Sequence, residues 1–505
     1  MSKARGSNPA TIRVSLEAGR SALLWRKQIA DTETPISAAL KLMEPERGDF
    51  LLESVEGGSV RGRFSLLGIA PDLVFRADGD KAQINRHWQT DRDAFADAPD
   101  DTLTALRALV EECKADTDPA LPPALACLVG HFGYETIGLV EKLPRPAPNP
   151  IGMPDMLFVR PTVILIFDRL EDALYLVAPL WQEKCANIDA AMAQAQDRLD
   201  AAAARLAGAL PPRPTLDAGD DIRFTPVLQP DRYAGMVNRA KDYIFAGDIF
   251  QVVLAQRFTA PFPLPPLALY RALRRINPSP FLYCLDMPGF SLIGSSPEIL
   301  VRVRDGEVTI RPIAGTRPRG KTSAEDIVNR DSLLADPKER AEHLMLLDLG
   351  RNDVGRVASA GTVTVTDSYT IEYYSHVMHI VSNVVGALDE KKDALDALFA
   401  GFPAGTVSGA PKVRACEIIA ELEPETRGAY AGGVGYFSPD GNMDSCIVLR
   451  TAVLKDGVMH AQAGAGIVAD SDPAYEQREC EAKSGALMAA AKEAVELARE
   501  GRYGQ

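Results

Sequence analysis

The chain has 505 residues, of which 46% are hydrophobic, enough to bury one large core or two. A net charge of −14, a pI of about 5.1 and the lack of any basic block argue against nucleic acid as a partner. Seven cysteines without CxxC spacing, no apolar signal core and no membrane-length apolar run predict a cytoplasmic protein without disulfides or structural zinc.

The first half of the chain is predicted to be rich in strands. Residues 1–25 indicate a flexible lead-in, residues 26–210 an N-terminal region, and the Pro- and Asp-rich residues 211–223 a linker. Within the N-terminal region we expect a short helix after Pro35, strands in DFLLES and GRFSLLGIAPDLVF, an amphipathic helix over 101–114, strands over 125–180 and a helix over 186–208.

Residues 224–505 are predicted to form a second, catalytic domain. Strands are expected in IFQVVLAQRF, around the Asp305-Gly306 turn, and as three strands around Asp440-Gly441 and Asp456-Gly457. Helices are expected over 230–245, 324–331, 337–350, 372–386, 393–399, 411–421 and 473–499. Hairpins without βαβ alternation predict an α+β fold, with mostly antiparallel β-sheets packed as a two-sheet core and helices outside.

The run AGAGIVADSDPAYEQRECEAK (463–483) is the most suggestive of a site. Gly464-Ala465-Gly466 reads as a small-residue turn that leaves backbone amides open to a ligand. Glu476, Glu479 and Lys483 follow at i, i+3 and i+7 on one face of the predicted helix, and apolar residues continue that face. The alternative is an ordinary surface Glu–Lys pair. The inward stripe favours a site, because buried carboxylates need partners.

A second acidic pair, Glu339 and Glu342, lies at i and i+3 on the helix that Asp336 is expected to cap. Glu342 shares its face with apolar residues, whereas Glu339 has an equal alternative as the third residue of a capping box. Two acidic pairs on largely apolar helices, without His or Cys ligands, favour magnesium shared with an anionic substrate.

Three further features bear on binding. The glycine-rich run 405–412 opens a helix and could hold a carboxylate, although such runs are more often merely turns. Arg450 beside Thr451 suits bidentate carboxylate binding, unless it is a surface charge on an edge strand. His379 lies among apolar residues, where a histidine is more often a core residue than a catalyst. The residues alone indicate a magnesium-dependent site for a small dianion, without naming the reaction.

Six runs resemble the chorismate-utilising enzymes, in that family's order. They are PIAGTRPRG (312–320), EHLMLLDLGRND (342–353), HVMHIVSNVVG (376–386), FPAGTVSGAPKVRACEII (402–419), GGVGYF (432–437) and AGAGIVADSDPAYEQRECEAK. DFLLES (49–54) and GRFSLLG (62–68) resemble the N-terminal region of the family's anthranilate synthase large components.

Two positions bear on which branch of the family the chain resembles. Gln251 stands where water-using members carry a lysine base, and an amide cannot deprotonate water. Ala314 stands where many aminodeoxychorismate synthases carry a lysine. The resemblance therefore implies that chorismate and ammonia give anthranilate and pyruvate, the first step of tryptophan biosynthesis. The alternatives are an aminodeoxychorismate synthase large component and a non-catalytic regulatory subunit on the same fold.

The resemblance also implies roles for individual residues. Magnesium would be held by Glu342 and Glu479, with Glu339 and Glu476 alongside, against the ring carboxylate of chorismate. Glu298 would be the general acid, and His379 would assist pyruvate elimination. The positions that match substrate-binding residues are Gly315, Thr316, Thr406, Tyr430, Arg450, Gly464, Ala465, Gly466 and Lys483.

Partners follow from the same resemblance. A separate glutamine amidotransferase subunit (component II) would supply ammonia within a hetero-oligomer, expected to be a heterotetramer. Tryptophan would act as a feedback inhibitor at an effector site that includes Ser54, Pro280, Phe281 and Leu282. Phe281 and Leu282 replace the more usual Tyr-Met of the family.

Overall fold

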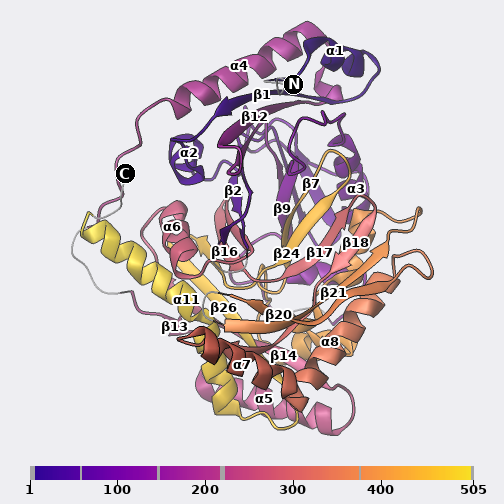
Figure 1. Cartoon of the computed structure of the whole chain (residues 1–505), viewed down its shortest axis with the longest axis vertical. Coiled ribbons are helices and arrows are strands. Elements are labelled where there is room, and N and C mark those ends of the chain that lie inside the picture. Colours follow the sequence, from indigo (N-terminus) through magenta and orange to yellow (C-terminus); the bar gives the residue numbers. More distant parts are fainter. Residues whose placement is uncertain (1–5, 57–59, 145–147, 217–221, 375–376, 502–505) are drawn as a thin grey trace.

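The computed structural model describes residues 6–56, 60–144, 148–216, 222–374 and 377–501 (Figure 1). Two large antiparallel sheets form its centre, and most helices lie on their outer sides. This confirms the predicted α+β class. Across the described ranges, no helix combines the length and the apolar character needed to cross a bilayer.

The first sheet has the strand order β1-β12-β11-β5-β2-β15-β16-β25-β26-β14-β13, and β22 (Gly409–Ala410) also pairs with β14. In that order the strands span Ala22–Ile29, Ala173–Leu180, Val163–Asp168, Phe64–Ile69, Asp49–Glu53, Phe281–Met287, Phe290–Ser296, Thr451–Lys455, Val458–Ile467, Gln251–Pro261 and Thr225–Pro226. The pairing of β2 with β15 joins the two halves of the chain, with Leu51 opposite Cys284.

The second sheet has the order β19-β21-β18-β17-β24-β23-β9-β10-β6-β7-β8, and β20 (Thr364–Tyr373) also pairs with β21. Its strands span Ile313–Pro318, Val377–Ala387, Glu307–Ile310, Ile299–Arg304, Met443–Ile447, Gly433–Phe437, Leu128–Phe132, Met156–Arg160, Leu73–Asp78, Lys81–Asn85 and Phe95–Asp97. Here β9 pairs with β23, so this sheet also contains strands from before and after the linker. The predicted regions 26–210 and 224–505 therefore each contribute strands to both sheets. The short strands β3 (Val55–Glu56) and β4 (Val60–Arg61) pair with each other.

The helices agree with the sequence pattern at most positions. They are α1 (Pro9–Glu17), α2 (Pro35–Leu42), α3 (Thr102–Glu112), α4 (Ile188–Leu206), α5 (Pro230–Phe245), α6 (Pro266–Ile276), α7 (Ser323–Ala335), α8 (Pro337–Gly355), α9 (Ala394–Gly401), α10 (Lys412–Leu422) and α11 (Pro473–Arg499). The predicted helices over 230–245 and 473–499 are confirmed to the residue. Asp336 caps α8 and Asp472 caps α11 through backbone N–H groups of the first turn, as Asp does at helix starts.

Two predicted elements are wrong, and one predicted segment has more regular structure than expected. Within the expected helix 372–386, residues 372–373 end β20 and residues 377–386 lie in β21, because buried Met378, Ile380 and Val384 alternate with less buried neighbours. The stretch 432–466 contains four strands, since the chain breaks at Arg450, whose φ is +49°. Part of the expected lead-in is ordered: α1 buries Ile12 and Leu16.

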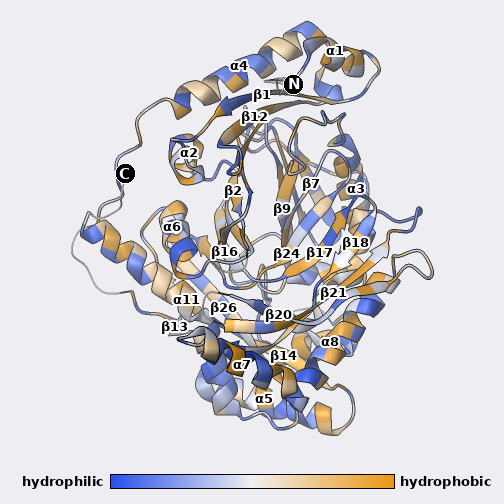
Figure 2. Ribbon diagram, in the orientation of Figure 1, coloured by the Kyte–Doolittle hydropathy of each residue, from blue (hydrophilic) through white to orange (hydrophobic). Residues whose placement is uncertain are grey.

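Two hydrophobic cores hold the layers together. One lies between the sheets and contains Phe75, Phe132 and Phe158. The other lies between the first sheet and helices α2, α4, α6 and α11, which contribute residues such as Leu199 and Leu487. Figure 2 shows hydrophobic residues along the strands around β2 and β9. The second core fixes α11 against β26, and this contact positions the acidic start of α11 beside the sheet.

Candidate active site

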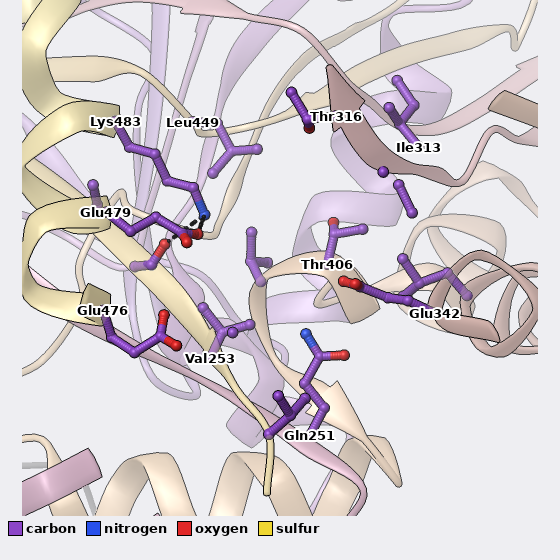
Figure 3. Close-up of a pocket in the computed structure, with 18 of the residues that line it drawn as sticks. Gln251, Val253, Ile313, Thr316, Glu342, Thr406, Leu449, Glu476, Glu479 and Lys483 are labelled. Carbon is purple, nitrogen blue, oxygen red and sulfur yellow. Dashed lines mark hydrogen bonds and ion pairs between the residues drawn. The ribbon is translucent and has the colours of Figure 1, made fainter. Parts of the chain in front are cut away.

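A cavity of about 910 Å³ opens between the first sheet, the β19–β21 edge of the second sheet, and the N-terminal turns of α8 and α11 (Figure 3). All but one of the residues predicted for catalysis, metal binding or substrate binding line it. They are Gln251, Glu298, Gly315, Thr316, Glu339, Glu342, His379, Thr406, Tyr430, Arg450, Gly464, Gly466, Glu476, Glu479 and Lys483. Residues more than two hundred positions apart are thus brought to one site by the sheet pairings.

Ala465 is the exception, and the expected turn around it is a strand. Gly464-Ala465-Gly466 lies within β26, where Gly466 pairs with Val253 of β14. Successive residues of a strand face opposite sides, so Ala465 is fully buried in the core while both glycines face the cavity. A Cβ on Gly464 would lie 2.7 Å from Tyr430 Oη, and one on Gly466 would lie 2.5 Å from Gln251 Nε2. The glycines therefore give room to these two side chains.

Glu339 and Glu342 enter the cavity from α8. Glu339 accepts a hydrogen bond of 2.8 Å from Arg317, which also pairs with Asp336 at the helix cap. Glu342 has no hydrogen-bond partner among the described residues, and Figure 3 shows its carboxyl pointing into the cavity. Burial, and then repulsion from Glu339, raises the pKa of Glu342. The capping contact is made by Asp336, so Glu339 remains available to the site.

Glu476 and Glu479 enter from α11, on the opposite side of the cavity from Glu342 (Figure 3). Glu476 is 5% exposed, and burial raises its pKa. Glu479 forms an ion pair of 2.7 Å with Lys483, whose Nζ also donates to the Gly464 carbonyl at 2.9 Å. The Glu–Lys pair of the alternative interpretation therefore exists, but it lies at the cavity wall, as the predicted site requires, and ties α11 to β26.

The donor set of these two helices fits a hard divalent cation. It consists of carboxylate oxygens, which magnesium prefers, and the pKa values of Glu342 and Glu476 are raised by burial first and by a neighbouring carboxylate second. In the described residues, however, no three His, Cys, Asp or Glu side chains are gathered as a ready metal cluster. The arrangement fits a magnesium ion that takes part of its ligands from an anionic substrate.

Glu298 is a buried carboxyl at the cavity wall. It follows β16, and the hydroxyl of Thr406 donates to its Oε1 at 3.1 Å. Burial raises the pKa of Glu298 to about 8, against the opposing effects of the Thr406 hydrogen bond and the Arg450 charge. The group is therefore mostly protonated at neutral pH, and it can donate a proton into the cavity.

His379 presents one defined ring nitrogen. Its Nδ1 lies 2.9 Å from the Gly315 carbonyl oxygen, which can only accept, and 3.1 Å from the Thr316 hydroxyl, which can also accept, so a proton on Nδ1 satisfies both contacts. Burial lowers the pKa of this imidazole, which favours the neutral form. The neutral ring then has its lone pair on Nε2, where it can accept a proton. Because the ring lines the cavity, its position favours a role in the site over that of an ordinary core residue.

Arg450 and several residues that the sequence did not single out complete the lining. Arg450 forms no ion pair with any carboxylate of the described residues, so its guanidinium is free for an anion. The unforeseen members are Arg317, Lys338, Gln462, Tyr475 and Arg478. Arg317 lies two positions after Gly315 within PIAGTRPRG, so this run could have indicated it as a further site residue.

A second cavity of about 850 Å³ lies between the sheets, and all four predicted effector residues line it. Ser54 follows β2. Pro280 precedes β15, the strand that pairs with β2, and Phe281 and Leu282 are the first residues of β15. Pro297 and Ile313 line both cavities, so the two cavities share a wall.

Comparisons with known proteins agree with this geometry. A model of the chorismate binding enzyme family matches residues 49–489. Anthranilate synthase component 1 from Cereibacter sphaeroides is 51% identical over 491 residues, which cover 97% of this chain and 98% of the relative. The protein of the same name from Thermus thermophilus is 47% identical over 475 residues, with 94% and 97% covered.

Solved structures show the same fold. Anthranilate synthase component I from Streptococcus pneumoniae superposes with a TM-score of 0.74 at 34% identity, covering 91% of this chain and 99% of that one. The menaquinone-specific isochorismate synthase from Escherichia coli gives a TM-score of 0.70 at 20% identity, covering 96% and 100%. At that identity the likeness shows the shared fold alone.

Proposed function

The chain belongs to the chorismate binding enzyme family, and we propose that it is the component 1 subunit of an anthranilate synthase. It converts chorismate and ammonia to anthranilate, pyruvate and water. One observation carries the assignment of the chemistry to the cavity: a protonated carboxyl, a neutral imidazole and two opposed acidic helices converge there.

Chorismate carries two carboxylates, and the cavity offers cations for them. Within the described ranges no carboxylate forms an ion pair with Arg450, which suits a bidentate contact with a substrate carboxylate. Lys483 spans Glu479 and the Gly464 carbonyl, so it stands at the boundary between the acidic helix and the substrate. The hydroxyl of Thr316 and the flat surface left by Gly464 and Gly466 border the same space.

Glu342 and Glu479, with Glu339 and Glu476 alongside, would hold magnesium against the ring carboxylate. When bound, the ion would neutralise that carboxylate and draw electron density from the diene. The side chains supply carboxylate oxygens from two sides. The raised pKa values of Glu342 and Glu476 mean that their charged forms are disfavoured without a cation, which supports a metal ion at this place.

Glu298 acts as the general acid of the first step. Ammonia forms a bond to C2, the ring electrons shift, and the C4 hydroxyl leaves as water with the Glu298 proton. The pKa of about 8 keeps this proton on the carboxyl at neutral pH. Gln251 lines the cavity and its amide is not a base, which suits a nucleophile that needs no deprotonation.

His379 acts in the second step. The new ammonium loses a proton, which restores Glu298, and Nε2 of His379 accepts the proton at C2. The C3–oxygen bond then breaks, the ring becomes aromatic, and the enolate of pyruvate leaves and takes the proton from His379, which gives pyruvate and restores the neutral imidazole. The Gly315 carbonyl holds the required tautomer by accepting from Nδ1.

Ammonia is expected from a partner amidotransferase in a hetero-oligomer. All seven cysteines lie within the described residues, and each is a buried free thiol. Burial raises the pKa of Cys480, which packs on Tyr233, and a protonated buried thiol is a poor nucleophile. This supports a chain that uses ammonia without making it from glutamine, in the reducing cytoplasm.

The second cavity is proposed as a tryptophan site. Its lining combines apolar Phe281 and Leu282 with Ser54 and Glu53, which suits an aromatic amino acid. The carboxylate of Glu53 is held by Arg274 at 2.8 Å through both of its oxygens, so the cavity wall is stiff there. Bound tryptophan would then inhibit the first step of its own synthesis.

The test is direct. The purified chain is incubated with chorismate, a magnesium salt and an ammonium salt, and anthranilate fluorescence is followed with and without tryptophan. Magnesium-dependent fluorescence that falls with tryptophan is the expected result. Ammonium-dependent consumption of chorismate without anthranilate would indicate an aminodeoxychorismate synthase, and ammonium-independent consumption an isochorismate synthase. Absence of all turnover would indicate a regulatory subunit.

A further inference from the structure

A buried tyrosine bridges the two cavities. Tyr374 lines the second cavity at the end of β20, and its side chain is 7% exposed. The centroid of its ring lies 5.3 Å from that of His379, with an angle of 70° between the ring planes. This edge-to-face contact places Tyr374 directly against the imidazole that lines the first cavity.

The other end of Tyr374 is tied to charged residues of the second cavity. Its hydroxyl donates to Glu372 Oε2 at 3.1 Å, and Glu372 forms an ion pair with Arg311. Both charged residues line the second cavity. A ligand carboxylate or ammonium that enters this part of the cavity would compete for one member of the pair.

The main chain of Tyr374 is fixed, so the side chain must take up any change. Its N–H donates to the Val377 carbonyl at 2.8 Å, and its carbonyl accepts from Arg319 at 2.8 Å. Burial raises the pKa of the Tyr374 phenol, so the hydroxyl stays a neutral donor. A change of partner at the hydroxyl can therefore act only by turning the ring that rests on His379.

We propose that Tyr374 is a positioning residue for His379, and that through Glu372 and Arg311 it couples the second cavity to the first. His379 is held on one side by the Gly315 carbonyl and on the other by the Tyr374 ring. Rotation of that ring moves Nε2 away from the substrate while leaving the metal-binding acids in place. This coupling rests on the proposed function of both cavities.

Two variants separate the two roles. Tyr374→Phe removes the hydroxyl and keeps the ring, so tryptophan should bind within about threefold of the wild-type affinity, measured by calorimetry. The factor by which saturating tryptophan slows the ammonia-dependent reaction should fall about tenfold, since the coupling between two sites is commonly 5- to 150-fold. Tyr374→Leu removes the ring, so kcat should fall about tenfold or more with KM for chorismate little changed. The acid limb of its kcat profile should also move to higher pH, as water reaches the imidazole.

A matched control is available on the same strand. Tyr369 makes an edge-to-face contact with a different histidine, His343, at 4.7 Å, and its hydroxyl is also hydrogen bonded. Tyr369→Phe should leave inhibition unchanged. Full inhibition in Tyr374→Phe, or an unchanged pH profile in Tyr374→Leu, would overturn the proposal. If tryptophan does not bind the wild-type chain, the proposed tryptophan site is refuted. The pH profile of Tyr374→Leu then decides by itself whether Tyr374 positions His379.

Discussion

The Thr406 hydroxyl and the Glu298 carboxyl lie 3.1 Å apart, and this contact joins the glycine-rich run 405–412 to the end of β16. Thr406 belongs to a short 3₁₀ turn, Gly405–Val407, so a backbone segment with little regular structure carries the main partner of the proposed general acid. Burial therefore raises the pKa of Glu298, and the hydrogen bond from Thr406 in this turn partly lowers it.

The pH dependence of the reaction should report Glu298. A general acid works while protonated, so at a constant concentration of free ammonia kcat should fall as pH rises through about 8. Glu298→Gln should lower kcat by about 10²- to 10⁴-fold and remove this fall in kcat at high pH, the alkaline limb of the profile. Thr406→Val deletes a hydrogen bond that lowers the pKa, so the limb should move upward by less than about one pH unit. An unchanged limb in Glu298→Gln would contradict the assignment.

Glu479→Ala should abolish magnesium-dependent turnover and leave the fold intact. The pair with Lys483 is partly exposed, and such pairs stabilise a protein by about 0–1 kcal/mol, so thermal unfolding should change little. Magnesium affinity, measured by calorimetry with chorismate present, should fall at least about 100-fold. Glu481→Ala is the control, because Glu481 lies exposed on the same helix. Near-normal activity in Glu479→Ala would refute the metal assignment.

Ser54→Phe should relieve tryptophan inhibition with turnover retained. Ser54 packs so closely on Gly62 that a larger side chain must turn into the second cavity and fill it. Inhibition curves and direct tryptophan binding should weaken together, by about tenfold or more. Unchanged inhibition would argue that the inhibitor binds elsewhere.

Arg427→Met should destabilise the protein by about 3–5 kcal/mol, as expected when one partner of a buried ion pair is removed. Arg427 is 1% exposed; it pairs with Glu423 and donates to the carbonyls of Val253 and Val407, both at 2.7 Å. Urea unfolding measures the change. Arg414→Met, which removes more exposed pairs, should cost about 0–1 kcal/mol. Equal effects of the two variants would show that burial is not the cause.

Much of the fold could be predicted from local signals, and the failures have a physical pattern. Helices α5 and α11, which both have Pro at their first positions, have the expected ends, and Asp472 also caps α11. The sequence of 372–386 predicts a helix because a buried strand of Val, Ile and Met resembles a continuous apolar run. Gly464-Ala465-Gly466 resembles a turn because the sequence does not show that Tyr430 and Gln251 need the space of a missing Cβ.

The site was predictable as a set of residues but not as a relation between two cavities. Motifs carry chemistry that must touch the substrate, and 15 of the 16 residues predicted for catalysis, metal binding and substrate binding line one cavity, Ala465 being the exception. Tyr374 touches no substrate, and its importance depends on the pairing of β20 with β21, which brings it against His379. No spacing along the chain signals such a contact.

The exchange of strands between the two halves has a consequence for synthesis on the ribosome. Strand β9 (128–132) can pair with β23 only after residues 433–437 have emerged, and in the first sheet β2 (49–53) can pair with β15 only after residues 281–287 have emerged. Until then the early strands carry open edges that invite pairing with other chains. A nascent chain of this kind benefits from chaperones, and a fragment cut at the linker should aggregate instead of yielding an uninhibited enzyme.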